Sequence, residues 1–333
     1  MLFALLFLLF LTFIYALNSG SYHLPFDRIF TILYQSVTNP GLLESTPSEK
    51  IVVIDFRLPR VLLAILTGIS LAIAGCVMQA LLRNPLVSPF TLGLSSAASF
   101  GAAMAIVFGA SIMPFIPPEF QNGVIILCAF LLGWLSILLI YGISRMKGSS
   151  SATLILAGVV IGYIFTAGVM ILKYLTNDEK LREITLWLMG GMWGANWGAV
   201  VIVAPITLLC FLYLESLAWD LNTLSAGDDV AKNLGVNVNG LRIKGLLIST
   251  FAASACLAFT GIIGFIGLMG PHIGRMLIGN DNRYLIPCSA LLGGLILLIS
   301  DTAARTIMDP IEIPVGVIMY VIGGIFFMFL ILR

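Results

Sequence analysis

Residues 61–82 read VLLAILTGISLAIAGCVMQALL, a stretch without one charged side chain. A helix that crosses a bilayer needs about 20 consecutive apolar residues, and this stretch supplies them. The rest of the chain follows the same pattern, since 59% of its 333 residues are hydrophobic and only 10% are charged. Such runs are continuous rather than alternating, which favours helices over a β-barrel. The sequence therefore predicts an all-α polytopic membrane protein with one transmembrane domain over residues 1–333.

Short polar connections divide the chain into ten apolar segments, and we predict that each is a transmembrane helix. The segments are Leu2–Leu17, Leu58–Leu82, Thr91–Gly109, Gln121–Ile143, Ala152–Tyr174, Gly198–Leu214, Leu241–Thr260, Ile262–Ile278, Tyr284–Ser300 and Pro314–Leu332. An even number of spans places both termini on one side of the membrane. Lys and Arg favour cytoplasmic connections, so Arg145, Arg242, Lys244 and Arg283 mark the cytoplasmic side. Both termini are then expected in the cytoplasm.

Ionisable residues are almost missing from the middles of these segments. Asp301 and Arg305 fall at the end of one segment, and His272 and Arg275 toward the end of another. Carriers driven by protons or ions place such residues inside their spans. The sequence also lacks the G-x-x-x-x-G-K-[ST] motif of nucleotide-hydrolysing loops and the H-E-x-x-H motif of metalloproteases. If this protein moves a solute uphill, its energy must come from a partner.

Two other classes stay open at this point. A secondary carrier would need intramembrane ionisable groups, and a membrane-embedded enzyme would need paired acidic or metal-ligand residues near the lipid interface. The five cysteines are scattered singly, without a C-x-x-C pair, so no metal site is expected. The net charge of +1 gives no sign of nucleic-acid binding, and no nucleic acid is expected as a partner.

The connection at residues 215–240 is the longest on the predicted cytoplasmic side and offers a docking surface for a partner. Ser225 followed three residues later by Asp228 has the form of a capping box, and an acidic residue there favours the helix N-terminus. Gly235 has the position of a residue that ends a helix at C′. We predict a short helix outside the membrane between these residues.

Several motifs resemble the FecCD-type permeases, the membrane subunits of ATP-binding-cassette (ABC) importers for iron–siderophore complexes, haem and vitamin B12. The matching stretches are Arg57-Leu-Pro-Arg60, Gly75-Cys-Val-Met-Gln79, Asn84-Pro-Leu86-Val-Ser-Pro89, Leu221–Gly235, Gly264-Phe-Ile-Gly267-Leu-Met-Gly-Pro271-His272-Ile-Gly-Arg275 and Glu312-Ile-Pro314-Val-Gly316. Their order and spacing match from about Arg57 to the C-terminus. The resemblance implies a fold like that of the vitamin B12 importer permease.

The same resemblance implies the partners and the location. It implies a homodimer in the cytoplasmic membrane of a bacterium or archaeon, with cargo passing along the subunit interface. Two cytoplasmic ATPases, which bind ATP and Mg, would drive it, and a periplasmic or lipid-anchored binding protein would deliver the cargo. This chain would then be a transport subunit without a cofactor of its own rather than an enzyme.

Site residues follow from the resemblance, residue by residue. The ATPase-coupling residues would be Asn222, Leu224, Ser225, Gly227, Asp228, Asp229, Leu234 and Gly235. The cytoplasmic gate would include Asn84, Leu86, Ser150 and Ser151, and the binding protein would dock on Arg57, Arg60 and Arg305.

The arginine pair also carries an argument of its own. Arg57 and Arg60 fall in the first turn of a predicted helix, three residues apart and on one face. A cation there opposes the helix dipole, so another use of the charge is expected. Snorkelling to the interface or pairing with Asp55 are the alternatives to docking.

The cargo stays open between two classes. Most of the resembled family carries organic metal chelates, whereas a smaller branch carries molybdate or tungstate. The predicted spans show no basic ring that would mark an oxyanion route, although helix N-termini can also bind oxyanions. We expect a metal-containing cargo and place an iron chelate ahead of molybdate.

Overall fold

The computed structural model describes residues 1–20, 22, 24–38, 47–112, 117, 120–146 and 150–332, and among these no strand occurs. Its helices are α1 (Leu2–Asn18), α2 (Phe26–Thr38), α3 (Pro47–Lys50), the π-helical η1 (Ile51–Arg57), α4 (Leu58–Leu82), α5 (Leu94–Ile112), α6 (Gln121–Met146), α7 (Ser151–Leu175), α8 (Asp178–Met189), α9 (Trp197–Ser216), α10 (Ala218–Ser225), α11 (Asp228–Asn233), α12 (Val238–Thr260), α13 (Ile266–Ile278), α14 (Asn282–Thr306) and α15 (Val315–Leu332). The all-α prediction is confirmed.

Each of the ten predicted spans corresponds to a helix. Among the described residues, seven helices are long and apolar enough to cross a membrane, and α1 and most of α5 are shorter apolar helices. The tenth, α13, begins at Ile266 rather than at the predicted Ile262. Phe265 precedes it with a φ of 65°, a left-handed conformation that a continuing α-helix does not contain.

Helix α4 has the predicted bounds, Leu58–Leu82, but Leu58 is not a free helix start. Helical structure runs without a break from Pro47 through η1 into α4, so Arg57 and Arg60 lie well inside it. The argument from an unfavourable helix dipole therefore does not apply to them, because that effect is confined to the first turn. The sequence analysis also missed α2 and α8, two helices of 13 and 12 residues in polar connections.

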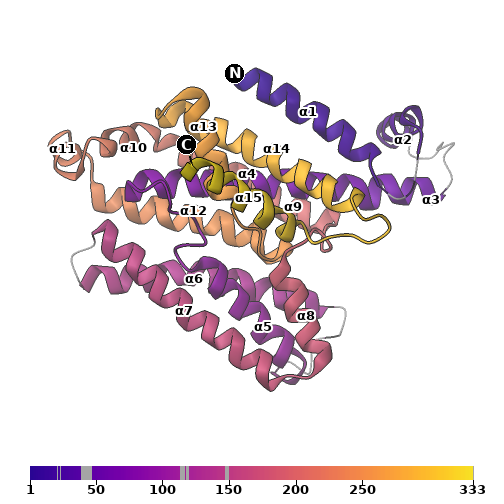
Figure 1. Ribbon diagram of the computed structural model, residues 1–333, viewed down its shortest axis with the longest axis horizontal. Helices are drawn as coiled ribbons and strands as arrows, with labels where there is room; N and C mark the ends of the chain where they lie inside the picture. Colours follow the sequence, from indigo (N-terminus) through magenta and orange to yellow (C-terminus); the bar gives the residue numbers. More distant parts are fainter. Residues whose placement is uncertain are drawn as a thin grey trace.

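Helix α4 lies at the centre of the bundle, packed against α12, α13 and α14 (Figure 1). Glycines allow the closest approaches. A Cβ on Gly68 would lie 2.2 Å from the carbonyl oxygen of Gly293, and one on Gly75 would lie 1.9 Å from that of Gly267. Small residues permit such backbone contact between membrane helices. These glycines thus fix α13 and α14 against α4.

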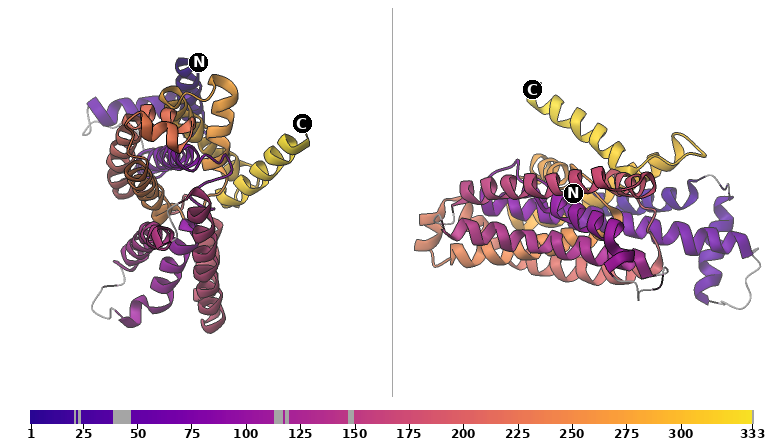
Figure 2. Two further views of the ribbon diagram at one scale, coloured as in Figure 1. Left: turned by 90° about the vertical axis from the view of Figure 1, so that its left-hand side faces the viewer. Right: turned by 90° about the horizontal axis from the view of Figure 1, so that it is seen from below.

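Helices α5 to α8 form a second group beside this central bundle, joined to it mainly through contacts between α6 and α12 (Figure 1). Along the long axis, α10 and α11 lie at one end of the molecule, and α2 and α3 lie at the other. Helix α15 leans away from the body (Figure 2). Only 22% of its 18-residue apolar stretch is buried, against 78% for such a stretch in the continuous helix Ser48–Leu82 that contains α4. The two ends of the bundle carry the sites described next.

Candidate functional site

The connection at residues 215–240 folds into two short helices, α10 and α11, with Gly227 between them. The predicted capping box is wrong. The Ser225 hydroxyl donates to the carbonyl oxygen of Asn222 (2.6 Å) and ends α10, so it does not cap the next helix. Gly227 occupies the N-cap of α11 instead, with a φ of 118° that side chains rarely adopt. Asp228 and Asp229 do lie in the first turn, as expected.

The predicted end of this helix is confirmed. Gly235 has a φ of 89°, and its N–H donates to the carbonyl oxygen of Lys232 (3.0 Å). The N–H of Val236 donates to the carbonyl oxygen of Ala231 (2.9 Å). Together these bonds form a Schellman motif, which satisfies carbonyl groups left free at the helix end.

Exposure divides the predicted coupling residues into two groups. Leu234 is 70% exposed and the adjacent Val230 on α11 is 45% exposed, so both present apolar surface outside the bundle. Leu224 is fully buried in the same apolar cluster as Leu81 and Leu221. Leu224 therefore anchors α10 to the bundle, and its side chain does not reach the surface of the subunit.

Asn222 fixes α10 to the beginning of α14. Its amide donates to an Asp281 carboxylate oxygen (2.7 Å), and its own oxygen accepts from the backbone and side-chain N–H groups of Asn282 (both 2.8 Å). The Arg283 guanidinium and the Asn222 amide hold the pKa of Asp281 well below its usual range. The Arg283 guanidinium also lies 4.1 Å from the centre of the Trp219 ring on α10.

Asp228 fixes α11 to two further helices. Its carboxylate lies 2.9 Å from Nη1 and Nη2 of Arg242 on α12, and 3.2 Å from Nη2 of Arg83 at the end of α4. Arg242 is buried, whereas Arg83 is exposed. Sequence reasoning used Arg242 only as a sign of the cytoplasmic side, because nothing in the sequence shows which acid it meets.

The predicted gate residues lie next to this cluster. Asn84 follows Arg83, and its side-chain oxygen accepts from the backbone N–H of Leu86 (2.9 Å), whose side chain is 64% exposed. Ser150 caps α7 by accepting from the backbone N–H of Thr153. The Ser151 hydroxyl accepts from Nη2 of Arg242 (3.2 Å). The structure thus brings both gate segments to the end of the bundle that carries α11.

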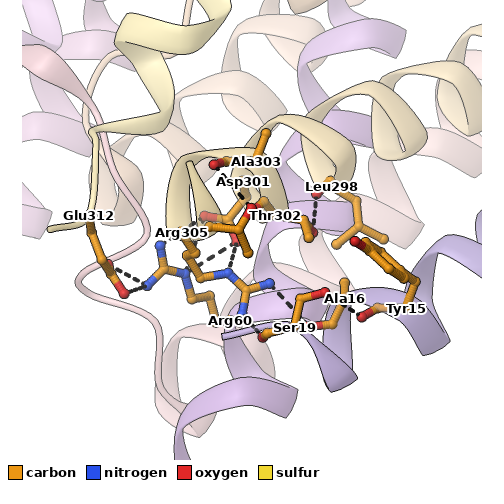
Figure 3. A network of polar contacts seen from close by, with 11 residues as sticks. Tyr15, Ala16, Ser19, Arg60, Leu298, Asp301, Thr302, Ala303, Arg305 and Glu312 are labelled. Atoms are coloured by element: carbon orange, nitrogen blue, oxygen red, sulfur yellow. Dashed lines mark hydrogen bonds and ion pairs between the residues drawn. The ribbon is translucent and has the colours of Figure 1, made fainter. Parts of the chain in front are cut away.

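At the opposite end, two of the predicted docking arginines, Arg60 and Arg305, meet the carboxylates of Asp301 and Glu312 (Figure 3), and the third, Arg57, lines the same pocket. Arg60 contacts Asp301 (3.0 Å) and Glu312 (2.7 Å), and Nε of Arg305 lies 3.2 Å from Asp301. Asp301 is fully buried, whereas the Glu312 side chain is 40% exposed. Sequence reasoning did not identify Glu312 as a member of this site, although it lies in a matching motif.

The arginines also hold the end of α1. Arg57 is buried and donates to the carbonyl oxygens of Leu17 (2.9 Å) and Tyr22. Arg305 is also buried and donates to those of Ala16 and Ser19 (both 3.2 Å; Figure 3). Carbonyl groups at the end of a helix have no partner within it, and these guanidinium groups supply one.

A pocket of about 390 Å³ opens onto this cluster. All three arginines and Glu312 line it, together with Tyr22, Phe56 and Trp193. Three cations and two carboxylates leave one positive charge in excess around the pocket. Its chemistry suits a carboxylate or another anion that arrives from outside the chain.

Comparison with known proteins agrees with the residue pattern. The model of the FecCD transport family matches residues 8–333. The chain belongs to this family. It is 40% identical to the hemin transport system permease protein of Yersinia pestis over 330 residues, which cover 98% of this chain and 94% of the relative. It is 35% identical to the molybdate import system permease protein of Haemophilus influenzae, over 97% of this chain and 92% of the relative.

A solved structure supports the fold of this FecCD protein over nearly its whole length. The neighbour is described as an inward-facing conformation of a metal-chelate type ABC transporter. It superposes with a TM-score of 0.85 at 33% identity and covers 99% of this chain and 98% of its own. The chain is therefore a multi-pass membrane permease of the ABC transporter type.

Proposed function

We propose that this chain is the permease subunit of a binding-protein-dependent ABC importer that moves a metal-containing cargo through a homodimer. The observation that carries the proposal is that one helical bundle bears a partner-facing surface at each end. The short helix α11, with the exposed apolar side chains of Val230 and the following Leu234, lies at one end, and an arginine-lined pocket lies at the other. A transport subunit that two different partners control needs both.

The distribution of carboxylates supports an external energy source. In the seven candidate spans the acidic residues are Glu49, Asp55, Glu215 and Asp301, and each lies within eight residues of an end of its span. Coupling to a proton or ion gradient needs ionisable groups along the path. ATP hydrolysis by two cytoplasmic subunits, with ATP and Mg bound there, supplies the energy in this proposal.

Basic residues support the orientation. Arg83, Lys232, Arg242, Lys244 and Arg283 all belong to the end of the bundle that carries α10 and α11 or to the helices that start there. Positive charge favours the cytoplasmic side. We therefore place this end, and both termini, in the cytoplasm and the arginine pocket on the outer face of a cytoplasmic membrane.

The outer pocket suits a binding protein with acidic residues. One excess positive charge attracts a carboxylate, and charges at the rim of an interface mainly set its association rate. A homodimer presents the pocket twice, which fits a partner with two lobes. Arg57 and Arg305 would act from inside the pocket, because their side chains are buried and hold α1.

The homodimer and its gate can be tested together. Helix α15 exposes Val321, Ile325 and Phe329 away from the body of the subunit, a surface that lipid or a second subunit must cover. We expect Ser151→Cys to crosslink between subunits in at least one nucleotide state. If crosslinking fails in every nucleotide state, the gate lies elsewhere.

The cargo proposal places an iron chelate such as a siderophore complex or haem ahead of molybdate, because the haem-transporting relative is more similar than the molybdate-transporting one. The deciding experiment reconstitutes the chain with its ATPase and binding protein in proteoliposomes. ATP hydrolysis and uptake are measured with haem, a ferric siderophore or molybdate. We expect one cargo to stimulate both. Uptake that proceeds without the ATPase under an ion gradient would instead show a secondary carrier.

A further inference from the structure

We propose that Arg242 is the positioning residue through which the coupling helix α11 controls the cytoplasmic gate. This inference rests on the proposed importer function and assigns it a residue. The Arg242 side chain is only 5% exposed and lies in the second turn of α12. A buried guanidinium at the edge of a bundle needs partners for its N–H groups, and their identity shows what it connects.

All three nitrogens of this guanidinium are engaged, and together they reach three other helices. Nη1 and Nη2 both lie 2.9 Å from the carboxylate of Asp228, the first residue of α11. Nη2 also donates to the hydroxyl of Ser151, the first residue of α7 (3.2 Å). Nε donates to the carbonyl oxygen of Leu81 in the last turn of α4 (3.3 Å).

These three partners connect α11 to both gate segments. Ser151 is itself a gate residue, and the last turn of α4 leads through Arg83 to Asn84 and Leu86. Arg83 reaches the same carboxylate, with Nη2 3.2 Å from Oδ1 of Asp228. A displacement of α11 that carries Asp228 therefore acts on α7 through Arg242 and on the end of α4 through both arginines.

The geometry needs arginine rather than any cation. A guanidinium presents its donors in a fixed plane, so two can bind one carboxylate while others point at a hydroxyl and a carbonyl group. A lysine ammonium keeps the charge but offers one nitrogen and cannot span the three helices. Arg242→Lys therefore separates the positioning role from a simple requirement for charge.

The test follows labelling at position 86 in the complete transporter. The Leu86→Cys variant of the chain is assembled with its ATPase in nanodiscs. It is then treated with a hydrophilic maleimide in two conditions, one without nucleotide and one with ATP trapped by vanadate. Mass spectrometry of this chain measures the labelling rate at residue 86. We expect the rate to change with nucleotide state in the parent, and the change to be lost in Arg242→Lys and Asp228→Asn.

Matched controls remove other charges close by. Lys244→Gln on α12 and Asp220→Asn on α10 change exposed side chains and should keep the parental response. Ser151→Ala should weaken the response, and adding it to Asp228→Asn should have no further effect, because both act through Arg242. If Arg242→Lys does not assemble, the role of Arg242 is tested by comparing Ser151→Ala and Asp228→Asn with the variant that combines them.

The outcomes separate the two proposals. A parental response that survives in Arg242→Lys, or equal losses in Lys244→Gln and Arg242→Lys, would overturn the role of Arg242. Independent, multiplicative effects of Ser151→Ala and Asp228→Asn would overturn it as well. If labelling at residue 86 of the parent does not depend on nucleotide, the gate assignment and the role of Arg242 are both refuted. The importer function is tested separately, by ATP-driven uptake.

Discussion

The two ends of the bundle use the same chemistry for different purposes. At the outer end, Arg60 and Arg305 share the fully buried Asp301, which belongs with Arg305 to α14 in the packed core. At the inner end, Arg83 and Arg242 share Asp228, which is 29% exposed and belongs to a surface helix of six residues. In both places arginines outnumber carboxylates, but the carboxylate that two arginines share lies on an element outside the core only at the inner end.

This difference determines which of the two clusters can transmit movement. Asp301 joins α14 to α4, whose backbones already touch through Gly68 and Gly293, so their relative position is fixed without the ion pair. Asp228 joins α12 and the end of α4 to α11, a six-residue helix that buries only Ala231 in the core. In the proposed importer, the outer cluster therefore keeps the docking surface for the binding protein in a fixed shape. The inner cluster moves with α11, the helix that the ATPase displaces.

The largest expected effect comes from Asp301→Asn. Removing one partner of a buried ion pair leaves its arginines uncompensated, at a cost of about 3–5 kcal/mol in the free energy of unfolding. Glu312→Gln is the matched control, since its side chain is 40% exposed and an exposed ion pair contributes about 0–1 kcal/mol. Thermal unfolding of both variants in detergent measures the difference. Equal stability of the two variants would mean that the outer cluster does not maintain the fold there.

A smaller effect on stability, but a large one on coupling, is expected from Gly227→Pro. Proline fixes φ near −65°, whereas Gly227 has a φ of 118° and donates its N–H to the carbonyl oxygen of Leu224 (3.0 Å). Gly227→Ala strains the same φ but should have a milder effect than proline, because alanine keeps the N–H and its Cβ would meet only Nη1 of Arg83, at 3.7 Å. ATP hydrolysed per cargo imported is the measurement. Tight coupling in a well-expressed proline variant would show that the position of α11 is unimportant.

The sequence predicted the membrane-spanning helices well because continuous apolar runs are a local signal. It missed α2 and α8, whose 13 and 12 residues are amphipathic and too short to span. It gave the bounds of α4 correctly but missed the helical segment before it, because Asp55 and Arg57 interrupt the apolar run although the backbone stays helical through η1. Helix ends that depend on tertiary contacts leave no comparable pattern.

The site was predicted as a set of residues but not as a set of contacts. Arg60 meets residues 241 and 252 positions away, a pairing that one sequence cannot reveal. Leu224 and Leu234 look alike in the sequence, yet one is fully buried and the other is 70% exposed. Gly235 was identified correctly because a helix end with a positive φ has a local signature.

The smallest expected effect concerns Glu312→Gln and the outer pocket. Glu312 is the exposed carboxylate of the cluster and occupies Nη1 of Arg60 at 2.7 Å. Its neutralisation raises the positive charge at the pocket, so an acidic binding protein should associate faster, by a few-fold at low salt. The gain should shrink as salt increases, because screening weakens attraction between exposed charges.

The measurement is the association rate of the binding protein on the variant in nanodiscs across a salt series. The dissociation rate and basal ATP hydrolysis should change little, since Asp301 still pairs with Arg60 and Arg305 and the inner cluster is untouched. A slower association rate would mean that Glu312 itself contacts the partner. If association does not depend on salt in either the parent or the variant, the three arginines do not attract the binding protein. Their role is then structural, through their contacts with α1, Asp301 and Glu312.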